Sequence, residues 1–152
     1  GTQRVARLRG LLEAEKKTGM HKAGGVLADP SAAIALIWLR RSLDFQNCLL
    51  DGLGTDRDAL VTNVAREAYR THLESYHNFW LKNTFRAGLA AMPARGDFIQ
   101  RLGIHLQESM KPEEIEQICY SEMAELVEVQ QKVVATMSAL FVELDLEDSR
   151  KA

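Results

Sequence analysis

Apolar side chains recur at helical spacing along most of the chain. The first such segment, Gln3 to Lys17, has valine and leucine at intervals of three and four with arginine and glutamate between them, which predicts a short amphipathic helix. The stretch from Thr18 to Ala28 contains three glycines without a sustained period, which predicts a loop. Asp29 and Pro30 then have the order of an N-cap and a first-turn proline, so we expect a helix to begin there.

The segment from Pro30 to about Asp51 predicts a central helix. It is apolar on nearly every face near its start, which is typical of a buried helix. We expect Gly52 and Gly54 to end it. From Asp56 to Met92 the apolar positions keep a helical spacing, and because about 35 residues is long for one globular helix, we expect a bend near its middle.

The rest of the chain predicts two further helices. Asp97 to His105 forms a short one, and Lys111-Pro112-Glu113-Glu114 places a proline and acids in a first turn, which is typical of a helix start. We expect this last helix to run toward Leu144. Nowhere does the sequence alternate as a strand with a hairpin turn would. The predicted class is therefore all-α, and 152 residues fit one domain.

Composition excludes several classes of function. Charged residues make up 26% and the net charge is -2, so we expect no nucleic-acid partner. The four histidines include no pair four residues apart, and the sequence has no phosphate-binding loop, so we predict no metal, no cofactor and no enzyme activity. Cys48 and Cys119 lack the spacing of a disulfide framework and are expected to be buried thiols. Without a long apolar run or a signal-peptide core, a cytoplasmic protein is the simplest expectation.

Two segments are unusual. In ALIWLRRSLDF, spacings of 4, 3 and 4 place four side chains along one side of the central helix: Ile34, Trp38, Arg41 and Phe45. In AYRTHLESYHNFWLKNTF, the same kind of spacing turns His77 inward among Leu73, Trp80 or Leu81, and Phe85. Taken alone, these patterns favour ordinary core packing for Trp38 and His77. For Arg41, pairing with a buried carboxylate stays an open interpretation.

Together, the two segments resemble the glycolipid transfer protein family. In that family a WLKRGL-like segment on the central helix precedes an AY…L..YH.W…F segment and a proline-containing P…F turn. Here these are WLRRSL, AYRTHLESYHNFW and MPARGDF, while VARLRGLLEAEKK is similar to the family helix before the loop. The likeness extends from about Val5 to Leu102.

The resemblance implies a two-layer, all-helical sandwich that transfers one sphingolipid between membranes without catalysis. It also implies transient peripheral contact with those membranes. By position, Trp38 matches the tryptophan on which the sugar stacks, and His77 matches the histidine that hydrogen-bonds the ceramide amide. The remaining matched positions are Ile34 at the head group, Phe45, Leu73 and Phe85 in an apolar tunnel for the chains, Phe79 and Trp80 at the membrane contact, and Arg41 as a structural cation.

Position 38 also distinguishes head groups within the family. In the branch that resembles ceramide-1-phosphate carriers, positions 34 and 38 are arginines, which pair with phosphate. Ile34 and Trp38 offer a phosphate no charge, so the sequence favours a glycosphingolipid. The alternatives are a phosphosphingolipid carrier or lipid sensor, and a helical interaction module that has lost lipid binding.

The chain departs from the family pattern at one end. The family's D-x-x-x-N-x-x-K helix precedes the segment that VARLRGLLEAEKK resembles, and the sequence contains no counterpart of it. We therefore expect residues 1–152 to form a single domain that is N-terminally incomplete relative to the family. Ser42 also replaces the glycine of WLKRGL.

Overall fold

The computed structural model describes residues 2–22 and 26–150 of the chain. These residues form α1 (Thr2–Lys17), α2 (Ala32–Thr55), α3 (Val61–His72), α4 (Phe79–Ala90), α5 (Arg95–Leu102) and α6 (Pro112–Glu143), with short 3-10 helices η1 (Glu74–Tyr76) and η2 (Ile104–Leu106). No strand occurs within these ranges, and the predicted all-α class is confirmed. Part of the predicted loop from Thr18 to Ala28, residues 23–25, lies outside the described residues.

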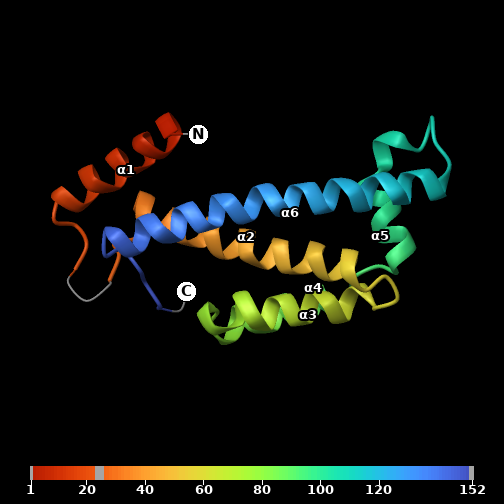
Figure 1. Cartoon of the computed structure of the whole chain (residues 1–152). Helices are drawn as coiled ribbons and strands as arrows, with labels where there is room; N and C mark the ends of the chain where they lie inside the picture. The colour runs from red at the N-terminus through yellow and green to blue at the C-terminus, as the bar shows by residue number, and fades with distance from the viewer. Residues whose placement is uncertain (1, 23–25, 151–152) are drawn as a thin grey trace.

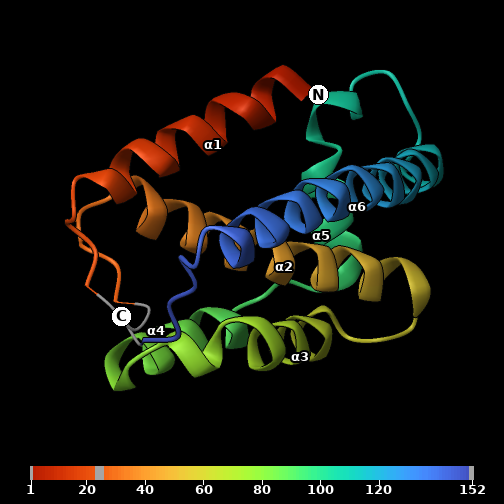
Figure 2. The same ribbon diagram turned by 60° about the vertical axis from the view of Figure 1, so that its left-hand side comes forward.

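Helix α2 runs through the middle of the molecule (Figures 1 and 2). It packs against α6 on one side and against α3 on the other, while α4 packs against α3 and α5 against α6. Helix α1 contacts α2 and is joined to the end of α6 by two 2.6 Å hydrogen bonds from Arg9 to the carboxylate of Glu143. The arrangement is an all-helical sandwich with α2 at its centre.

Buried side chains gather in three clusters, and α2 contributes to each of them. One lies between α2, α3 and α4, a second between α1, α2 and the end of α6, and a third between α2, α5 and α6. The α2 members are, in that order, Leu49 and Leu53, then Ala33 and Ile37, then Leu50. The prediction of a buried central helix is therefore confirmed.

The start of α2 lies two residues later than predicted. Ser31, not Asp29, is its N-cap, and the Ser31 hydroxyl accepts from the N–H of Ile34 at 3.1 Å. The Glu15 carboxylate on α1 accepts from the two N–H groups that precede that of Ile34, those of Ala32 and Ala33, at 2.6 and 2.8 Å. Because two side chains together satisfy the first turn, the helix begins at Ala32.

The predicted stop of α2 at Gly52 and Gly54 is wrong, because the helix continues to Thr55. Gly52 serves helix packing instead: a Cβ at this position would lie 2.6 Å from Cγ1 of Val64 on α3. The guanidinium of Arg95 then donates to the carbonyls of Leu53 and Asp56, both at 2.8 Å. Arg95, from another helix, thus satisfies main-chain carbonyls at the end of α2.

The segment from Asp56 to Met92 is broken rather than bent. Helix α3 ends at His72, η1 follows, and α4 begins at Phe79. Asn78 caps α4 by accepting from the N–H of Leu81 at 3.0 Å. Asn78 was a usable sequence signal for this new start, since asparagine is among the preferred N-cap residues.

The last helix follows its prediction. Helix α6 begins at Pro112, the N–H of Lys111 donates to the Glu114 carboxylate at 2.9 Å, and Leu144 is the C-cap. The short helix α5 overlaps the predicted range Asp97–His105 but is shifted toward the N-terminus: it begins at Arg95 and ends at Leu102. No helix in the described ranges is long and apolar enough to cross a membrane.

Candidate functional site

The fold brings Trp38 and His77 together from two different segments. Trp38 is a half-buried side chain on α2, and His77 lies in the link between η1 and α4. Their ring centroids are 5.8 Å apart at an interplanar angle of 30°. The inward orientation predicted for His77 is confirmed, since only 6% of it is exposed. It arises from the link after α3, however, and not from the continuous helix that the spacing predicted.

Three aromatic rings surround the imidazole of His77. Besides Trp38, these are Tyr69 at 5.5 Å and Phe85 at 5.2 Å between centroids. The Tyr69 hydroxyl also lies 3.1 Å from Nδ1 of His77, within hydrogen-bond distance. Burial, and then the positive charge of Lys82, lower the pKa of His77 below its ordinary value. The imidazole is therefore neutral near pH 7, when one ring nitrogen donates and the other accepts.

Arg41 lies beneath the indole and is 4% exposed. Its guanidinium is 3.6 Å from the ring centroid of Tyr76 and 4.9 Å from that of Trp38. It donates a hydrogen bond to the main-chain carbonyl of Asp148, so its partner is a carbonyl and not the buried carboxylate considered from the sequence. Burial lowers the pKa of Arg41, but a guanidinium keeps its charge in proteins.

Residues after α6 hold this arginine in place. Asp148 is 3% exposed, and its carboxylate accepts from the N–H of Leu27 at 3.0 Å and from Nε of Arg150 at 2.9 Å. Burial by itself would raise the pKa of Asp148, but the hydrogen bonds from Arg150 and Leu27 lower it to about 2. We call Leu27, Arg41, Asp148 and Arg150 the C-terminal clasp. It links the loop before α2, α2 itself and the end of the chain.

The predicted tunnel residues lie together next to His77. Phe45 on α2 meets Phe85 on α4 edge to face at 6.1 Å, and Phe85 stacks on Tyr69 at 4.7 Å. Leu73 is 4% exposed in the same cluster. These side chains pack directly on one another, so a bound hydrocarbon chain would have to displace some of them.

Other predicted residues lie apart from this aromatic cluster. Ile34, one turn before Trp38, packs partly buried against the cluster shared by α1, α2 and α6. Phe79 and Trp80 contact each other at 5.8 Å between centroids and are 70% and 78% exposed. Of the two cysteines, Cys119 is buried as predicted and Cys48 is half-buried.

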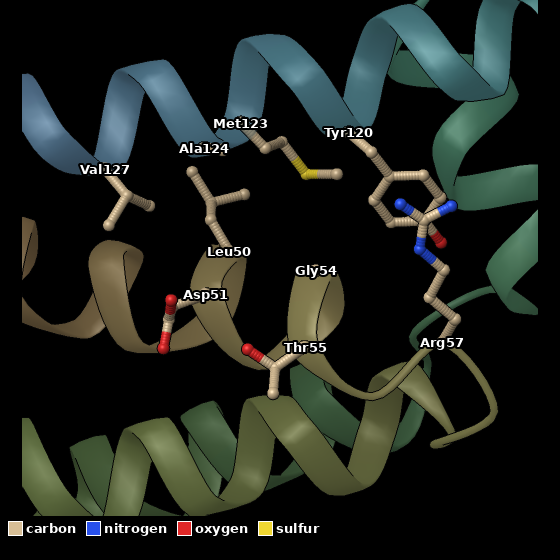
Figure 3. A pocket seen from close by; sticks show the side chains of 9 residues that line it. All are labelled: Leu50, Asp51, Gly54, Thr55, Arg57, Tyr120, Met123, Ala124 and Val127. Carbon is tan, nitrogen blue, oxygen red and sulfur yellow. The ribbon is translucent and has the colours of Figure 1, made fainter.

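Two hollows in the surface lie away from Trp38 and His77. Figure 3 shows the first, a pocket of about 270 Å³ in which Leu50 of α2 points toward α6, the end of the Met123 side chain is directed toward Tyr120, and Arg57 covers the ring of Tyr120. The second is an open groove of about 530 Å³ between α1, α2 and α6, lined mainly by apolar side chains: Val5, Leu8, Leu36, Leu39, Val129, Lys132, Val133, Thr136 and Met137. No group of three metal-binding side chains occurs in the described part of the chain.

Sequence reasoning assigned no role to Tyr69, Tyr76 or Asp148, which all support this site. Tyr69 and Tyr76 stand inside the quoted AYRTHLESYHNFW segment, so their distance from His77 along the chain was a usable signal. Asp148 follows the last helix in a stretch without any pattern, and only the folded chain brings it to Arg41.

A match to a family model over most of the chain shows which protein family the chain belongs to. A sequence model of the glycolipid transfer protein family matches residues 1–104 of the 152. The chain belongs to the glycolipid transfer protein family. The resemblance noted in the sequence is thereby confirmed, and the matched range includes every predicted site residue.

Similar proteins come from distant organisms. The glycolipid transfer protein of Danio rerio is 36% identical over 104 residues, which cover 65% of this chain and 48% of the fish protein. The glycolipid transfer protein of the fungus Aureobasidium melanogenum is 37% identical over 73 residues, or 48% of this chain and 36% of the fungal one. The match thus covers about half of the length of the fish protein and a smaller share of the fungal one.

Solved structures confirm the fold. The GLTP-fold structure of FAPP2, described as selecting simple glycosphingolipids, superposes with a TM-score of 0.77 at 20% identity, over 95% of this chain and 65% of that one. The apo form of mouse ceramide-1-phosphate transfer protein superposes with a TM-score of 0.73 at 21% identity, over 93% and 65% of the two chains. The all-helical sandwich of the glycolipid transfer protein type is therefore established.

Proposed function

We propose that this chain binds one sphingolipid, most favourably a glycosphingolipid, and transfers it between membranes without chemical change. Family membership supports the proposal. The observation that carries it is the contact between Trp38 and His77, 5.8 Å apart between ring centroids. An indole and a neutral imidazole side by side supply the two kinds of contact that the polar end of such a lipid needs.

The head group would lie on the indole of Trp38. One face of a sugar ring presents C–H groups, which an aromatic ring covers well, while the hydroxyls at the ring edge find polar partners nearby. The imidazole of His77 would form a hydrogen bond with the amide of the ceramide. Because Tyr69 lies within hydrogen-bond distance of Nδ1, this role falls to Nε2, and the paired Nδ1 keeps the ring oriented.

A sugar suits this site better than a phosphate does. Neither Trp38 nor Ile34 offers a charge, and a buried phosphate without a cationic partner is costly. The second candidate, a phosphosphingolipid, is favoured by one observation: Arg41 lies against Trp38, and its buried Nε has no hydrogen-bond partner among the described residues. Because Arg41 is 4% exposed and one of its two terminal nitrogens is already bonded to Asp148, we rank this candidate second.

The hydrocarbon chains would enter the cluster of Phe45, Leu73 and Phe85 next to His77. An acyl chain of about sixteen methylenes would cost about 13 kcal/mol to expose to water, at about 0.8 kcal/mol each. A carrier therefore has to enclose the chains during transfer. The edge-to-face pair of Phe45 and Phe85 would separate as the lipid enters, which makes binding and helix movement parts of one step.

The membrane contact would be made by Phe79 and Trp80. Both rings are largely exposed at the start of α4, and aromatic side chains favour the interface between water and lipid. This contact lies at the end of α4 that follows His77, so a lipid leaving the membrane would meet the site directly.

The proposal is tested by measuring transfer of a fluorescent galactosylceramide between vesicles. We expect Trp38→Ala and His77→Leu each to lower the transfer rate at least about tenfold, because each removes a contact worth about 1.4 kcal/mol or more. Trp80→Ala is the matched control, since it removes the other indole. It should slow transfer but leave binding of a dispersed short-chain galactosylceramide unchanged.

Two outcomes would overturn this function. Unchanged transfer in both Trp38→Ala and His77→Leu would remove these residues from the mechanism. Failure of the wild-type chain to take up any sphingolipid would favour the helical interaction module. Native mass spectrometry of the purified chain decides between a sugar and a phosphate head group by the mass of the lipid that remains bound.

A further inference from the structure

The open groove between α1, α2 and α6 exposes apolar side chains to solvent. Leu39 of α2 is 49% exposed, and Val129 and Val133 of α6 are 58% and 45% exposed. An ordinary protein surface carries such residues singly, whereas here they line one hollow of about 530 Å³. A concave apolar surface of this kind favours contact with a second molecule.

Helix α1 contributes an open wall to this groove. The C-terminal half of the helix is fastened to the rest of the fold, because Lys16 donates to the carbonyl of Leu144 and Glu15 accepts from the first turn of α2. In the other half, Val5 lines the groove and is itself exposed. The first turns of α1 are therefore available for contact with another molecule.

The two helices at the edges of the groove carry opposite charge. Up to Leu12, α1 contains three arginines and no acidic residue, whereas α6 contains six glutamates and no basic residue between Pro112 and Gln131. Glu125 is exposed and stands one turn before Val129, on the face of α6 that lines the groove. Neither Glu125 nor the exposed Arg7 of α1 forms an ion pair with another side chain of the described residues.

We propose that this groove joins two copies of the chain in a twofold-symmetric dimer. Both copies present the same surface in such an interface, so every contact occurs twice. A twofold axis across the groove makes the two α6 helices antiparallel, and Val129 and Val133 of each copy then enter the groove of the other. The acidic part of each α6 faces the basic start of the partner's α1, which gives the interface complementary charge.

A second copy fits this groove better than an acyl chain does. An acyl chain in an open groove would keep one side in water and would leave the charges at the edges unmatched, whereas a second copy covers the groove and matches them. The proposal goes beyond the proposed lipid transfer and does not depend on it. The membrane contact proposed above lies on α4, and α4 and α1 are on opposite sides of α2 (Figures 1 and 2).

The first test is sedimentation equilibrium of the purified chain without lipid, over a wide range of concentrations. We expect the wild type to sediment as a dimer. Val133→Glu should weaken the dimer at least about tenfold, which corresponds to about 1.4 kcal/mol, because it places a charge in the apolar interface. Val142→Glu is the matched control, since Val142 is on the same helix, is 70% exposed and does not line the groove. This control should dimerise as the wild type does.

A second test reverses the charges on each side of the interface. One variant carries Arg4→Glu with Arg7→Glu on α1, and the other carries Glu122→Arg with Glu125→Arg on α6. Each variant alone should dimerise at least about tenfold more weakly, because like charges then face one another. An equal mixture of the two should form a heterodimer, because both contacts between the unlike copies again join opposite charges. A loss caused by misfolding would not be restored by mixing.

Several outcomes would contradict the dimer. They are a wild type that stays monomeric, open-ended assembly, equal weakening by Val133→Glu and Val142→Glu, and a mixture of charge variants that stays monomeric. A monomer that retains lipid in native mass spectrometry, and loses it in Val133→Glu, would show that the groove holds an acyl chain instead. Because no lipid is added in the sedimentation and mixing experiments, their failure leaves the proposed sphingolipid transfer to be judged by its own assay.

Discussion

The indole of Trp38 contacts one neutral and one charged group. The centroid of its ring lies 5.8 Å from that of the His77 imidazole and 4.9 Å from the guanidinium carbon of Arg41. Arg41 in turn donates to the main chain of Asp148. The orientation of a candidate head-group platform on α2 thus depends on residues near the end of the chain.

The C-terminal clasp makes a prediction about stability and pH. The folded pKa of Asp148 is about 2, below an unfolded value of about 3.9. The contribution of this carboxylate to the free energy of unfolding is therefore complete above about pH 4 and is lost as the pH falls through about 2. We expect Asp148→Asn to lower the free energy of unfolding at pH 7 by about 1–3 kcal/mol. The difference from the wild type should shrink between about pH 4 and pH 2, as measured by urea unfolding.

The adjacent residue provides the control for this prediction. Glu147 has the same charge but is exposed, in a pair with Arg40, so Glu147→Gln should change stability by less than about 1 kcal/mol. A difference between wild type and Asp148→Asn that stays constant from pH 7 to pH 2 would contradict the role given to this carboxylate.

At the residue scale, the sequence allowed a prediction of site residues only where they occur in a segment that matches a family motif. Trp38 and His77 could be proposed as neighbours because both occur in quoted segments, and the fold places them together. The clasp could not be predicted, because its hydrogen bonds join Leu27 to Asp148 and Arg41 to the same residue, more than a hundred positions away. No local spacing encodes such a contact.

At the scale of helices, local signals predicted some boundaries and missed others. Pro112 and the acids after it predicted the start of α6, whereas α2 continues past its glycines to Thr55, where Arg95 of another helix bonds to the carbonyl of Leu53. Gly52 is a misleading local signal, because a glycine at this place predicts a helix stop. In the structure it allows α2 to approach α3 closely, since a Cβ there would meet Val64.

Gly103, at the end of α5, lies against α6 with no space for a side chain, and this contact can be tested. A Cβ at Gly103 would lie 2.3 Å from Cγ2 of Ile115 and 3.2 Å from Sγ of Cys119. We expect Gly103→Ala to lower the free energy of unfolding by about 1–3 kcal/mol, because this core has no space for the methyl group. Thermal unfolding followed by circular dichroism measures the change.

Gly96, on α5 itself, is the matched position. A Cβ there would meet nothing within 4 Å, so Gly96→Ala should be neutral or should stabilise the chain by about 0.4–1 kcal/mol. Equal effects of the two substitutions would show that helix propensity, and not the contact between α5 and α6, governs Gly103.

At the scale of the molecule, the features expected of a lipid carrier follow one another along α3 and α4. The exposed pair Phe79 and Trp80, the buried His77 and the apolar cluster around Phe85 are neighbours along the chain, and α2 supplies Trp38 opposite them. The proposed function joins these features into one path.

The most direct test of this account is the emission of Trp38 itself. The chain has two tryptophans, so Trp80→Phe leaves Trp38 as the only indole. Titration with a dispersed short-chain glucosylceramide should change its emission until one lipid is bound per chain, and adding His77→Leu should weaken this binding about tenfold or more. Stoichiometric binding, detected by native mass spectrometry, with no change in Trp38 emission would contradict the claim that the sugar lies on this residue.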